Sequence, residues 1–268
     1  MLLLFLYAKN DTSYVSMSFE LSYCVFCHVI NTNLVNKEMK KEIKVIAFDA
    51  DDTLWVNEPY FQEAEKQFCT LLENYHPQHT ISQELFKTEM KNLHLYGYGI
   101  KGFLLCMIET ANRVSDRTAS LHIIDKIIEI GHELLQKPIE LLQGVQETLE
   151  SLNGDYKLVV ATKGDLLDQE RKLKNSGLEH YFHHIEIMSE KKESDYQKLF
   201  KHLDCQAENF LMLGNSIKSD IIPVLEMGGN AAHIPYHVTW THEQHETNLQ
   251  HENFIQLKSI NEILNYLK

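Results

Sequence analysis

The stretch Ile43-Lys-Val-Ile-Ala-Phe48, followed at once by Asp49-Ala-Asp51-Asp-Thr53, decides the fold. A mostly apolar run of this length, bounded by polar residues, is typical of a central strand in a parallel sheet. Alternate residues of an extended chain point to the same side, so Asp49 and Asp51 are expected to project together from the carboxyl end of the strand. Open α/β sheets bind ligands at that edge, and two adjacent carboxylates favour a cation. On acid spacing alone, a solvated acidic turn remains the alternative.

Three further apolar runs precede helix-like stretches, at residues 157–162, 184–188 and 209–214. Strands that alternate with helices indicate βαβ units and a parallel sheet. The sequence therefore predicts an α/β protein, with a Rossmann-like parallel sheet core and helices on both faces. We also expect a fifth strand at 231–235 and a closing helix at 255–267. Because parallel strands end at one edge, the polar residues that follow these runs are expected to meet Asp49 and Asp51.

The polar residues that follow the strands are, in chain order, Asp49-x-Asp51-x-Thr53-Leu54, Thr162, Lys191 and Gly214-Asn215-x4-Asp220. Together they resemble the four motifs of the haloacid dehalogenase (HAD) superfamily of phosphohydrolases. The resemblance runs from about residue 40 to at least residue 235, and four motifs in the expected order are much more specific than any one alone. It implies a Mg²⁺-dependent phosphatase with a mobile cap over its cleft.

The resemblance assigns a role to each motif residue. Asp49 would be the nucleophile that forms an aspartyl-phosphate, and Asp51 the general acid and base. Thr162 would hydrogen-bond a phosphoryl oxygen, and Lys191 would balance charge between the phosphoryl group and the carboxylates. The neighbouring Lys192 stays an alternative for that lysine. The ligands of Mg²⁺ would be Asp49, the backbone carbonyl of Asp51, Asp220 and Asn215.

Asn215 departs from the family pattern, in which the fourth motif usually begins Gly-Asp. An amide keeps the carbonyl oxygen but loses the charge, so we expect weaker Mg²⁺ affinity than in a Gly-Asp relative, with activity retained through Asp220. Superfamily members that cleave carbon–halogen bonds lack the second acid, so Asp51 favours phosphate-ester hydrolysis. A phosphomutase of the same superfamily, and a non-catalytic binding module that retained the fold, are the alternatives.

An insertion between the first two motifs is too long for a simple crossover. Its apolar residues recur at helical spacing in four stretches, which predicts a small helical bundle at residues 58–140. A helical insertion in this place resembles the cap domain of the superfamily, which closes over the cleft and excludes water. Residues 39–57 and 141–268 would then form the Rossmann-like catalytic core.

Candidate substrate contacts lie in both predicted domains. The segment Tyr96-Gly-Tyr-Gly-Ile-Lys101-Gly102 is expected to face the site, because its glycines allow close backbone approach. Lys101 would meet a phosphate or another anion there, or would be an exposed lysine on a helix–helix connector. Thr53 and Lys163, each in or beside a motif, complete the predicted contacts.

Composition limits the partners and the compartment. The net charge of −13 supplies no basic field for a nucleic acid, whereas a small phosphorylated metabolite fits a local site. No apolar run reaches the ~18 residues of a membrane span, and the first residues lack the basic segment of a signal peptide. Five scattered cysteines suit a reducing compartment. We therefore expect a cytoplasmic enzyme without a membrane partner, and a homodimer through the bundle is compatible with this pattern.

The first 38 residues differ from the rest, because they lack clear periodicity and Met39 reads as a normal start to the first strand. Our hypothesis is that residues 1–38 are an upstream extension outside the fold. Within them, Cys24-Val-Phe-Cys27-His28 spells the C-x-x-C-H pattern of haem attachment. The surrounding sequence supports neither haem, a redox pair nor a zinc site.

Overall fold

A computed structural model describes residues 42–244 and 249–267. The predictions for residues 1–38, including Cys24, Cys27 and His28, lie outside the described residues. Within the described part of the chain, no helix combines the length and the apolar character that a membrane crossing needs.

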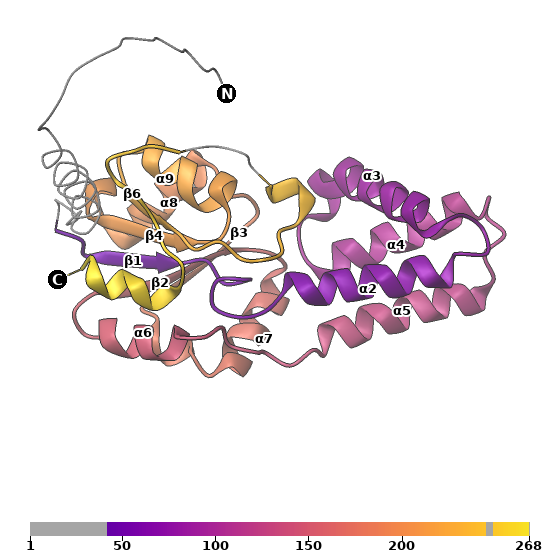
Figure 1. Ribbon diagram of the computed structural model, residues 1–268, viewed down its shortest axis with the longest axis horizontal. Coiled ribbons are helices and arrows are strands. Elements are labelled where there is room, and N and C mark those ends of the chain that lie inside the picture. Colours follow the sequence, from indigo (N-terminus) through magenta and orange to yellow (C-terminus); the bar gives the residue numbers. More distant parts are fainter. Residues whose placement is uncertain (1–41, 245–248, 268) are drawn as a thin grey trace, which may run out of the picture. The chain divides into compact units, whose positions relative to one another are not determined.

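The core is a sheet of six parallel strands in the order β3-β2-β1-β4-β5-β6 (Figure 1). In chain order, the strands are β1 (Val45–Phe48), β2 (Lys157–Lys163), β3 (His184–Met188), β4 (Phe210–Gly214), β5 (Asn230–His233) and β6 (Phe254–Gln256). The order reverses between β1 and β4, and the crevice at such a switch point is where doubly wound sheets bind ligands. The predicted Rossmann-like fold is confirmed.

Side-chain alternation along the central strands builds two hydrophobic cores, one on each face of the sheet. On β1, Ile46 and Phe48 point to one face, whereas Val45 and Ala47 point to the other. The first face packs against α6 (Val145–Leu152), α7 (Leu166–Ser176) and the 3₁₀ segment Ile260–Asn265. The second face packs against α8 (Glu193–Leu203) and α9 (Ile222–Glu226), which Figure 1 shows on the opposite side of the sheet.

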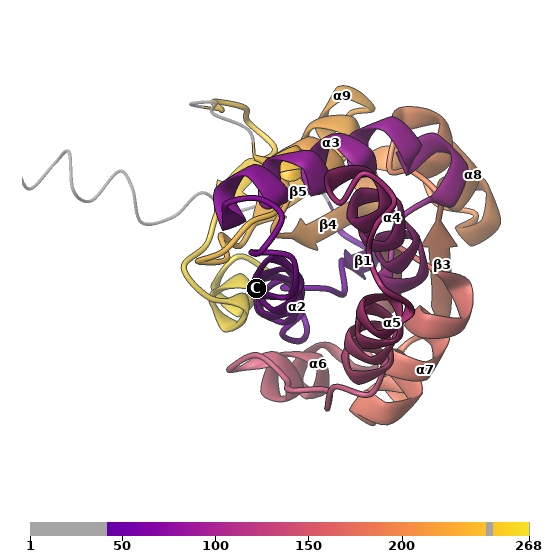
Figure 2. The same ribbon diagram turned by 90° about the vertical axis from the view of Figure 1, so that its right-hand side faces the viewer.

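The insertion after β1 folds into four helices (Figure 2), and their apolar side chains form a hydrophobic cluster of their own. The helices are α2 (Glu58–Leu71), α3 (Gln78–Tyr96), α4 (Ile100–Val114) and α5 (Leu121–Leu135). Asp52, with a positive φ of 59°, turns the chain away from the sheet. Its carboxylate accepts hydrogen bonds from the backbone N–H groups of Asn57 and Glu58, where α2 begins. The four predicted helices are therefore present.

The end of the chain differs from the prediction of one helix over 255–267. The structure has the short strand β6 and then the 3₁₀ segment Ile260–Asn265. Pairing of Ala232 with Ile255 covers the backbone of β5, which would otherwise be an open sheet edge. Buried Ile255, Leu257, Ile260 and Ile263 all join the first core, so their spacing fits a strand followed by a tight turn as well as a helix.

Candidate active site

The motif residues meet at the carboxyl edge of the sheet, where they line one cavity of about 190 Å³ between the sheet and the helical bundle. Asp49 follows β1 directly, and its N–H donates to the Leu213 carbonyl at 2.8 Å, which keeps it in register with β4. The motif residues that line the cavity are Asp49, Asp51, Thr162, Lys191, Asn215 and Asp220. They come from the ends of three strands and from the segments that follow β3 and β4.

Lys191 lies between two carboxylates. Its ammonium group donates to Asp49 Oδ1 and, at 2.6 Å, to Asp220 Oδ1, and its side chain is 1% exposed. Burial alone would lower the pKa of Lys191, but the charges of Asp220 and Asp49 raise it above its ordinary value. Lys192, left open as the alternative, is exposed at the N-terminus of α8 and points to no carboxylate of the motifs. The geometry therefore favours Lys191.

The carboxylate cluster carries more negative charge than Lys191 balances. Burial raises the pKa of the Asp49 carboxyl, and the Asp220 charge adds to this effect, while Lys191 opposes it. Thr53 lies within 3.4 Å of both Asp49 Oδ2 and Asn215 Oδ1. Carboxylate, amide and backbone carbonyl oxygens are the ligands that Mg²⁺ prefers, so this set of oxygens fits the ion.

Gly214 allows the Asp220 carboxylate to lie against the end of β4. A Cβ atom at position 214 would come within 2.2 Å of Asp220 Oδ2, which no side chain tolerates. Asp220 belongs to a π-helical turn, Ile217–Ile221, and the Ser216 N–H donates to its Oδ2 at 3.0 Å. Such turns often occur at functional sites because they redirect one side chain. The fourth motif thus requires a glycine at position 214 for steric reasons.

Three residues that the motifs did not reveal hold the Asp51 carboxylate. Trp55 Nε1 donates to Oδ1 at 2.8 Å, Lys172 Nζ donates to the same oxygen at 3.0 Å, and Gln169 Nε2 donates to Oδ2 at 2.8 Å. Gln169 and Lys172 stand three residues apart on α7, on one helix face. Their position in the helix after the second motif was the only available signal, because they lie more than 100 residues from Asp51 in the chain.

The three residues predicted to contact the substrate lie in different surroundings. Lys163 lines the cavity, but its ammonium donates to Glu243 Oε1 at 2.6 Å and to Ser219 Oγ at 2.9 Å. Thr53 is buried beside Asp49 and does not line the cavity. Lys101 does not line it either, because it pairs with Asp165 Oδ1 at 2.9 Å, outside the cleft.

Glu243 was also missed by sequence reasoning. It lies in the 3₁₀ segment Thr241–Glu243, lines the cavity, and accepts hydrogen bonds from Ser216 and Ser219 as well as from Lys163. Burial would raise the pKa of Glu243, but Lys163 and the two hydroxyl groups lower it to about 2. This ionised carboxylate fixes Lys163 beside the site.

The helical bundle supplies the wall of the cavity opposite the sheet. Tyr98, in the connection between α3 and α4, packs in a T-shaped arrangement with the Trp240 ring, and the Lys163 ammonium lies 4.3 Å from the centre of the Tyr98 ring. Three glutamates of α2 and α3 also line this wall, namely Glu58, Glu65 and Glu89. Burial, with the neighbouring carboxylates, raises the pKa of Glu58 and of Glu89 to about 8. This acidic wall is therefore lined with carboxyl groups, of which Glu58 and Glu89 are largely protonated at neutral pH.

Residues 43–228 match the model of a hydrolase family, which is described as haloacid dehalogenase-like hydrolase. A haloacid dehalogenase-like family hydrolase from Xanthomonas campestris is 36% identical, with a TM-score of 0.73, over 84% of this chain and 90% of that chain. No curated protein matches the chain.

More distant solved structures share the fold. A HAD hydrolase from Bacillus subtilis, bound to magnesium, is 16% identical with a TM-score of 0.57, over 85% of this chain and 99% of that one. A HAD phosphatase from Thermococcus onnurineus is 17% identical with a TM-score of 0.58, over 84% of this chain and 98% of that one. Other structures with this fold are described as dehalogenases. At these identities the likeness concerns the fold alone.

Proposed function

The chain belongs to the haloacid dehalogenase-like hydrolase family, and we propose that it is a Mg²⁺-dependent phosphatase acting on a small phosphorylated metabolite. The observation that carries the proposal is the position of Asp51. It lines the same cavity as Asp49 but is held by Trp55, Gln169 and Lys172 instead of by Lys191. The site thus offers a nucleophile and a separate proton carrier.

Asp49 is the proposed nucleophile. A carboxylate attacks phosphorus to give an aspartyl-phosphate, which divides one difficult step into two. The Lys191 ammonium, buried against Asp49 and Asp220, holds the attacking carboxylate in place and lowers the cost of bringing an anionic phosphoryl group to it. Thr162, at the end of β2, would donate its hydroxyl hydrogen to a phosphoryl oxygen.

Asp51 is the proposed general acid and base. The leaving alkoxide of a phosphate ester needs a proton, and the water that attacks the intermediate must lose one, so a single carboxyl group serves both steps. Breaking a carbon–halogen bond releases a halide that needs no proton. The residues around Asp51 therefore support ester hydrolysis over dehalogenation.

The proposed ligands of Mg²⁺ are oxygens of Asp49, Asp220, Asn215 and the backbone carbonyl of Asp51. When bound, the ion neutralises charge on the phosphoryl oxygens. The fold keeps these oxygens at one edge of the sheet, and the missing side chain of Gly214 leaves room for the Asp220 carboxylate.

The acidic wall of the cavity supports a substrate preference. Glu58 and Glu89 ionise only as the pH approaches about 8, so above that pH they would repel a second negative group on the substrate, and phosphate monoesters with a neutral or cationic remainder should then react faster than bisphosphates. We further propose that the enzyme works in the cytoplasm. Its thiols Cys69, Cys106 and Cys205 are free, which suits a reducing compartment.

The test measures phosphate release from a panel of phosphorylated metabolites, with Mg²⁺ and with a chelator, beside halide release from 2-haloacids. We expect metal-dependent phosphate release, and a loss of at least about 100-fold in Asp51→Asn, in which the proton carrier is removed. Halide release without phosphate release would replace the proposal with dehalogenation. Turnover that needs priming by a sugar bisphosphate would indicate a phosphomutase. A folded protein that releases neither product would support the binding module.

A further inference from the structure

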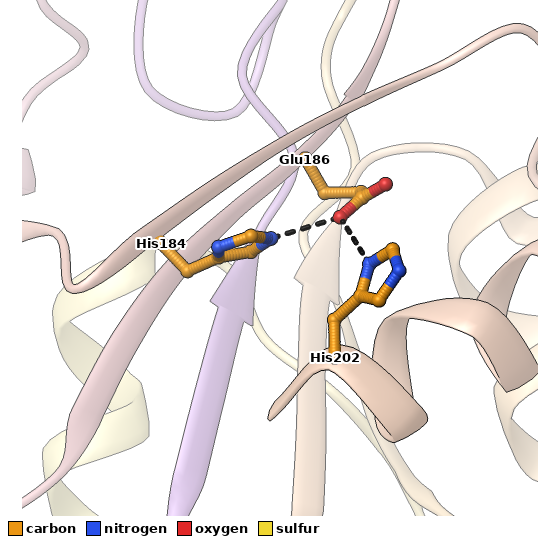
Figure 3. A group of neighbouring side chains, drawn as sticks. All are labelled: His184, Glu186 and His202. Atoms are coloured by element: carbon orange, nitrogen blue, oxygen red, sulfur yellow. Dashed lines mark hydrogen bonds and ion pairs between the residues drawn. The ribbon is translucent and has the colours of Figure 1, made fainter. Parts of the chain in front are cut away.

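A cluster of two histidines and one glutamate lies on edge strand β3 and the helix that covers it (Figure 3). His184 and Glu186 are two residues apart on β3, so their side chains leave the same face of the sheet. His202 comes from the last turn of α8. Hydrogen bonds join Glu186 Oε2 to His184 Nε2 at 2.8 Å and to His202 Nδ1 at 3.2 Å. The three potential ligand atoms lie within 4.8 Å of one another.

We propose that His184, Glu186 and His202 form a binding site for a transition-metal ion such as Zn²⁺, separate from the catalytic centre. Two imidazole nitrogens and one carboxylate oxygen are a ligand set with which proteins hold Zn²⁺ while leaving a fourth position to water. Imidazole also suits Ni²⁺, Co²⁺ and Cu²⁺, whereas Mg²⁺ prefers oxygen ligands alone. The two metal sites would therefore select different ions.

The observed geometry is close to what such an ion needs. Metal–ligand distances of about 2.0–2.2 Å in a tetrahedral site place the ligand atoms roughly 3.3–3.6 Å apart. The two hydrogen-bonded separations, 2.8 Å and 3.2 Å, are slightly shorter than this, and the separation of the two histidine nitrogens is at most 4.8 Å, so side-chain rotations would bring all three atoms to the distances that the ion needs. His184 and His202 are 33% and 55% exposed, which leaves a path for the ion and for the water in the fourth position.

The protonation of the two histidines is compatible with metal binding. A neutral imidazole carries its proton on either ring nitrogen. Each histidine can therefore bind the ion through the nitrogen that faces Glu186 when its proton lies on the other ring nitrogen, in which case a bond to the ion replaces the hydrogen bond to Glu186.

The position of the cluster gives the site a structural role. β3 is the edge strand of the sheet and pairs only with β2 among the described strands. His184 opens β3 at its amino end, whereas Lys191 follows its carboxyl end, so the cluster and the catalytic residues belong to opposite ends of the strand. An ion bound here would cross-link β3 to α8 and stabilise the folded chain by mass action.

The experiment titrates the full chain with Zn²⁺ in excess Mg²⁺, which occupies the catalytic oxygens. The variants are His184→Ala, His202→Ala and Glu186→Gln, and the control is His183→Ala, which removes an exposed neighbour outside the cluster. We expect one equivalent of Zn²⁺ bound by the wild type and by the control, and an affinity at least tenfold lower in the three variants. Zn²⁺ binding by Cys24, by Cys27 or by histidines other than the four residues replaced affects all five proteins equally, because every protein compared retains those residues.

Melting temperatures give the second readout. At about 100 times the dissociation constant, Zn²⁺ should raise the melting temperature by on the order of 5 °C in the wild type and in His183→Ala, but not in the cluster variants. Each variant is first melted without Zn²⁺, and Glu186→Gln, which preserves side-chain shape, decides the outcome if an alanine variant fails to fold. Equal Zn²⁺ binding and equal melting shifts in all five proteins would overturn the proposal, and so would no binding in the wild type.

Discussion

Lys191 and Lys192 are neighbours in the sequence but occupy opposite environments. Lys191 is buried between Asp49 and Asp220, whereas Lys192 is exposed where α8 begins. Removing a buried partner leaves two carboxylates without their shared cation, which is costly both for folding and for a reaction that brings in more negative charge.

We therefore expect Lys191→Met to lower kcat for phosphate release by about 100-fold or more, and Lys192→Met to stay within about twofold of the wild type. The measurement is steady-state kinetics on the best substrate of the panel. Melting curves, run in parallel, show whether each variant is folded. Equal losses in the two variants would mean that Lys191 has no special part in the reaction.

Asn215 places a neutral amide where a carboxylate would add charge to the metal ligands. Asn215→Asp should lower the Mg²⁺ concentration that gives half-maximal activity, by roughly tenfold, because ligand charge sets affinity in such oxygen sites. Asn57→Asp is the control, since Asn57 also lines the cavity but lies among the residues around Asp52 and Lys172. An unchanged Mg²⁺ dependence in Asn215→Asp would contradict the assigned ligand role.

Single residues were predictable from the sequence where a motif fixed them next to a strand end. Asp49 and Thr162 follow this rule, because each strand delivers them to the same edge. The residues that hold the Asp51 carboxylate were not predictable, because Gln169 and Lys172 come next to it only when the chain folds. For Lys101 the sequence left an anion contact and an exposed connector lysine open, and in the structure its ammonium pairs with the Asp165 carboxylate.

The connection between α3 and α4 brings the helical bundle onto the core. Gly99 has a positive φ of 103°, and a Cβ atom there would lie 3.1 Å from the backbone nitrogen of Asp165. Gly97, with a positive φ of 71°, has nothing within 4 Å of a Cβ atom. A side chain at either position would therefore carry similar backbone strain, but only at Gly99 would it also meet the core.

Gly99→Ala should lower kcat/KM by about tenfold more than Gly97→Ala, because it adds a clash between bundle and core to the strain that both variants share. Kinetics on one substrate for both variants make the comparison. The free energy of unfolding from denaturant melts should fall by a similar amount in each if strain alone acts on stability. Indistinguishable kinetics of the two variants would show that the close approach at Gly99 does not affect activity.

The elements that the sequence predicted well are those with long, uniform patterns. The central strands are apolar on both faces because helices cover both, and the four helices of the insertion have apolar residues at helical spacing. β6 was missed because three residues, Phe254–Gln256, are too few to show a period. Its partner β5 decides its conformation, and a single sequence does not reveal that contact.

For the whole molecule, the acidic wall of the cavity links stability to pH. Burial raises the pKa of Glu89 to about 8, above its ordinary value of 4.5. A carboxyl whose pKa is higher in the folded state stabilises the fold fully below pH 4.5, and this contribution is lost as the pH rises toward about 8. The same sign applies to Glu58.

Glu89→Gln should therefore flatten the fall in the free energy of unfolding between about pH 4.5 and pH 8, by an amount on the order of a few kcal/mol. Denaturant melts across this range, without substrate, measure the difference between variant and wild type. Glu73→Gln, an exposed glutamate of the same bundle, is the control and should follow the wild type. Parallel curves for Glu89→Gln and the wild type would show that the Glu89 carboxyl is ionised in the folded protein.

In the proposed reaction Asp49 carries the phosphoryl group and Asp51 is needed to release it. The most direct measurement mixes Asp51→Asn with Mg²⁺ and 4-nitrophenyl phosphate, whose leaving group needs no proton, and then quenches in acid for peptide mass spectrometry. We expect a burst of about one equivalent of nitrophenolate and a phosphoryl group on the peptide that contains Asp49. Steady turnover with Asp49 unmodified, or a phosphoryl group on another residue, would contradict it.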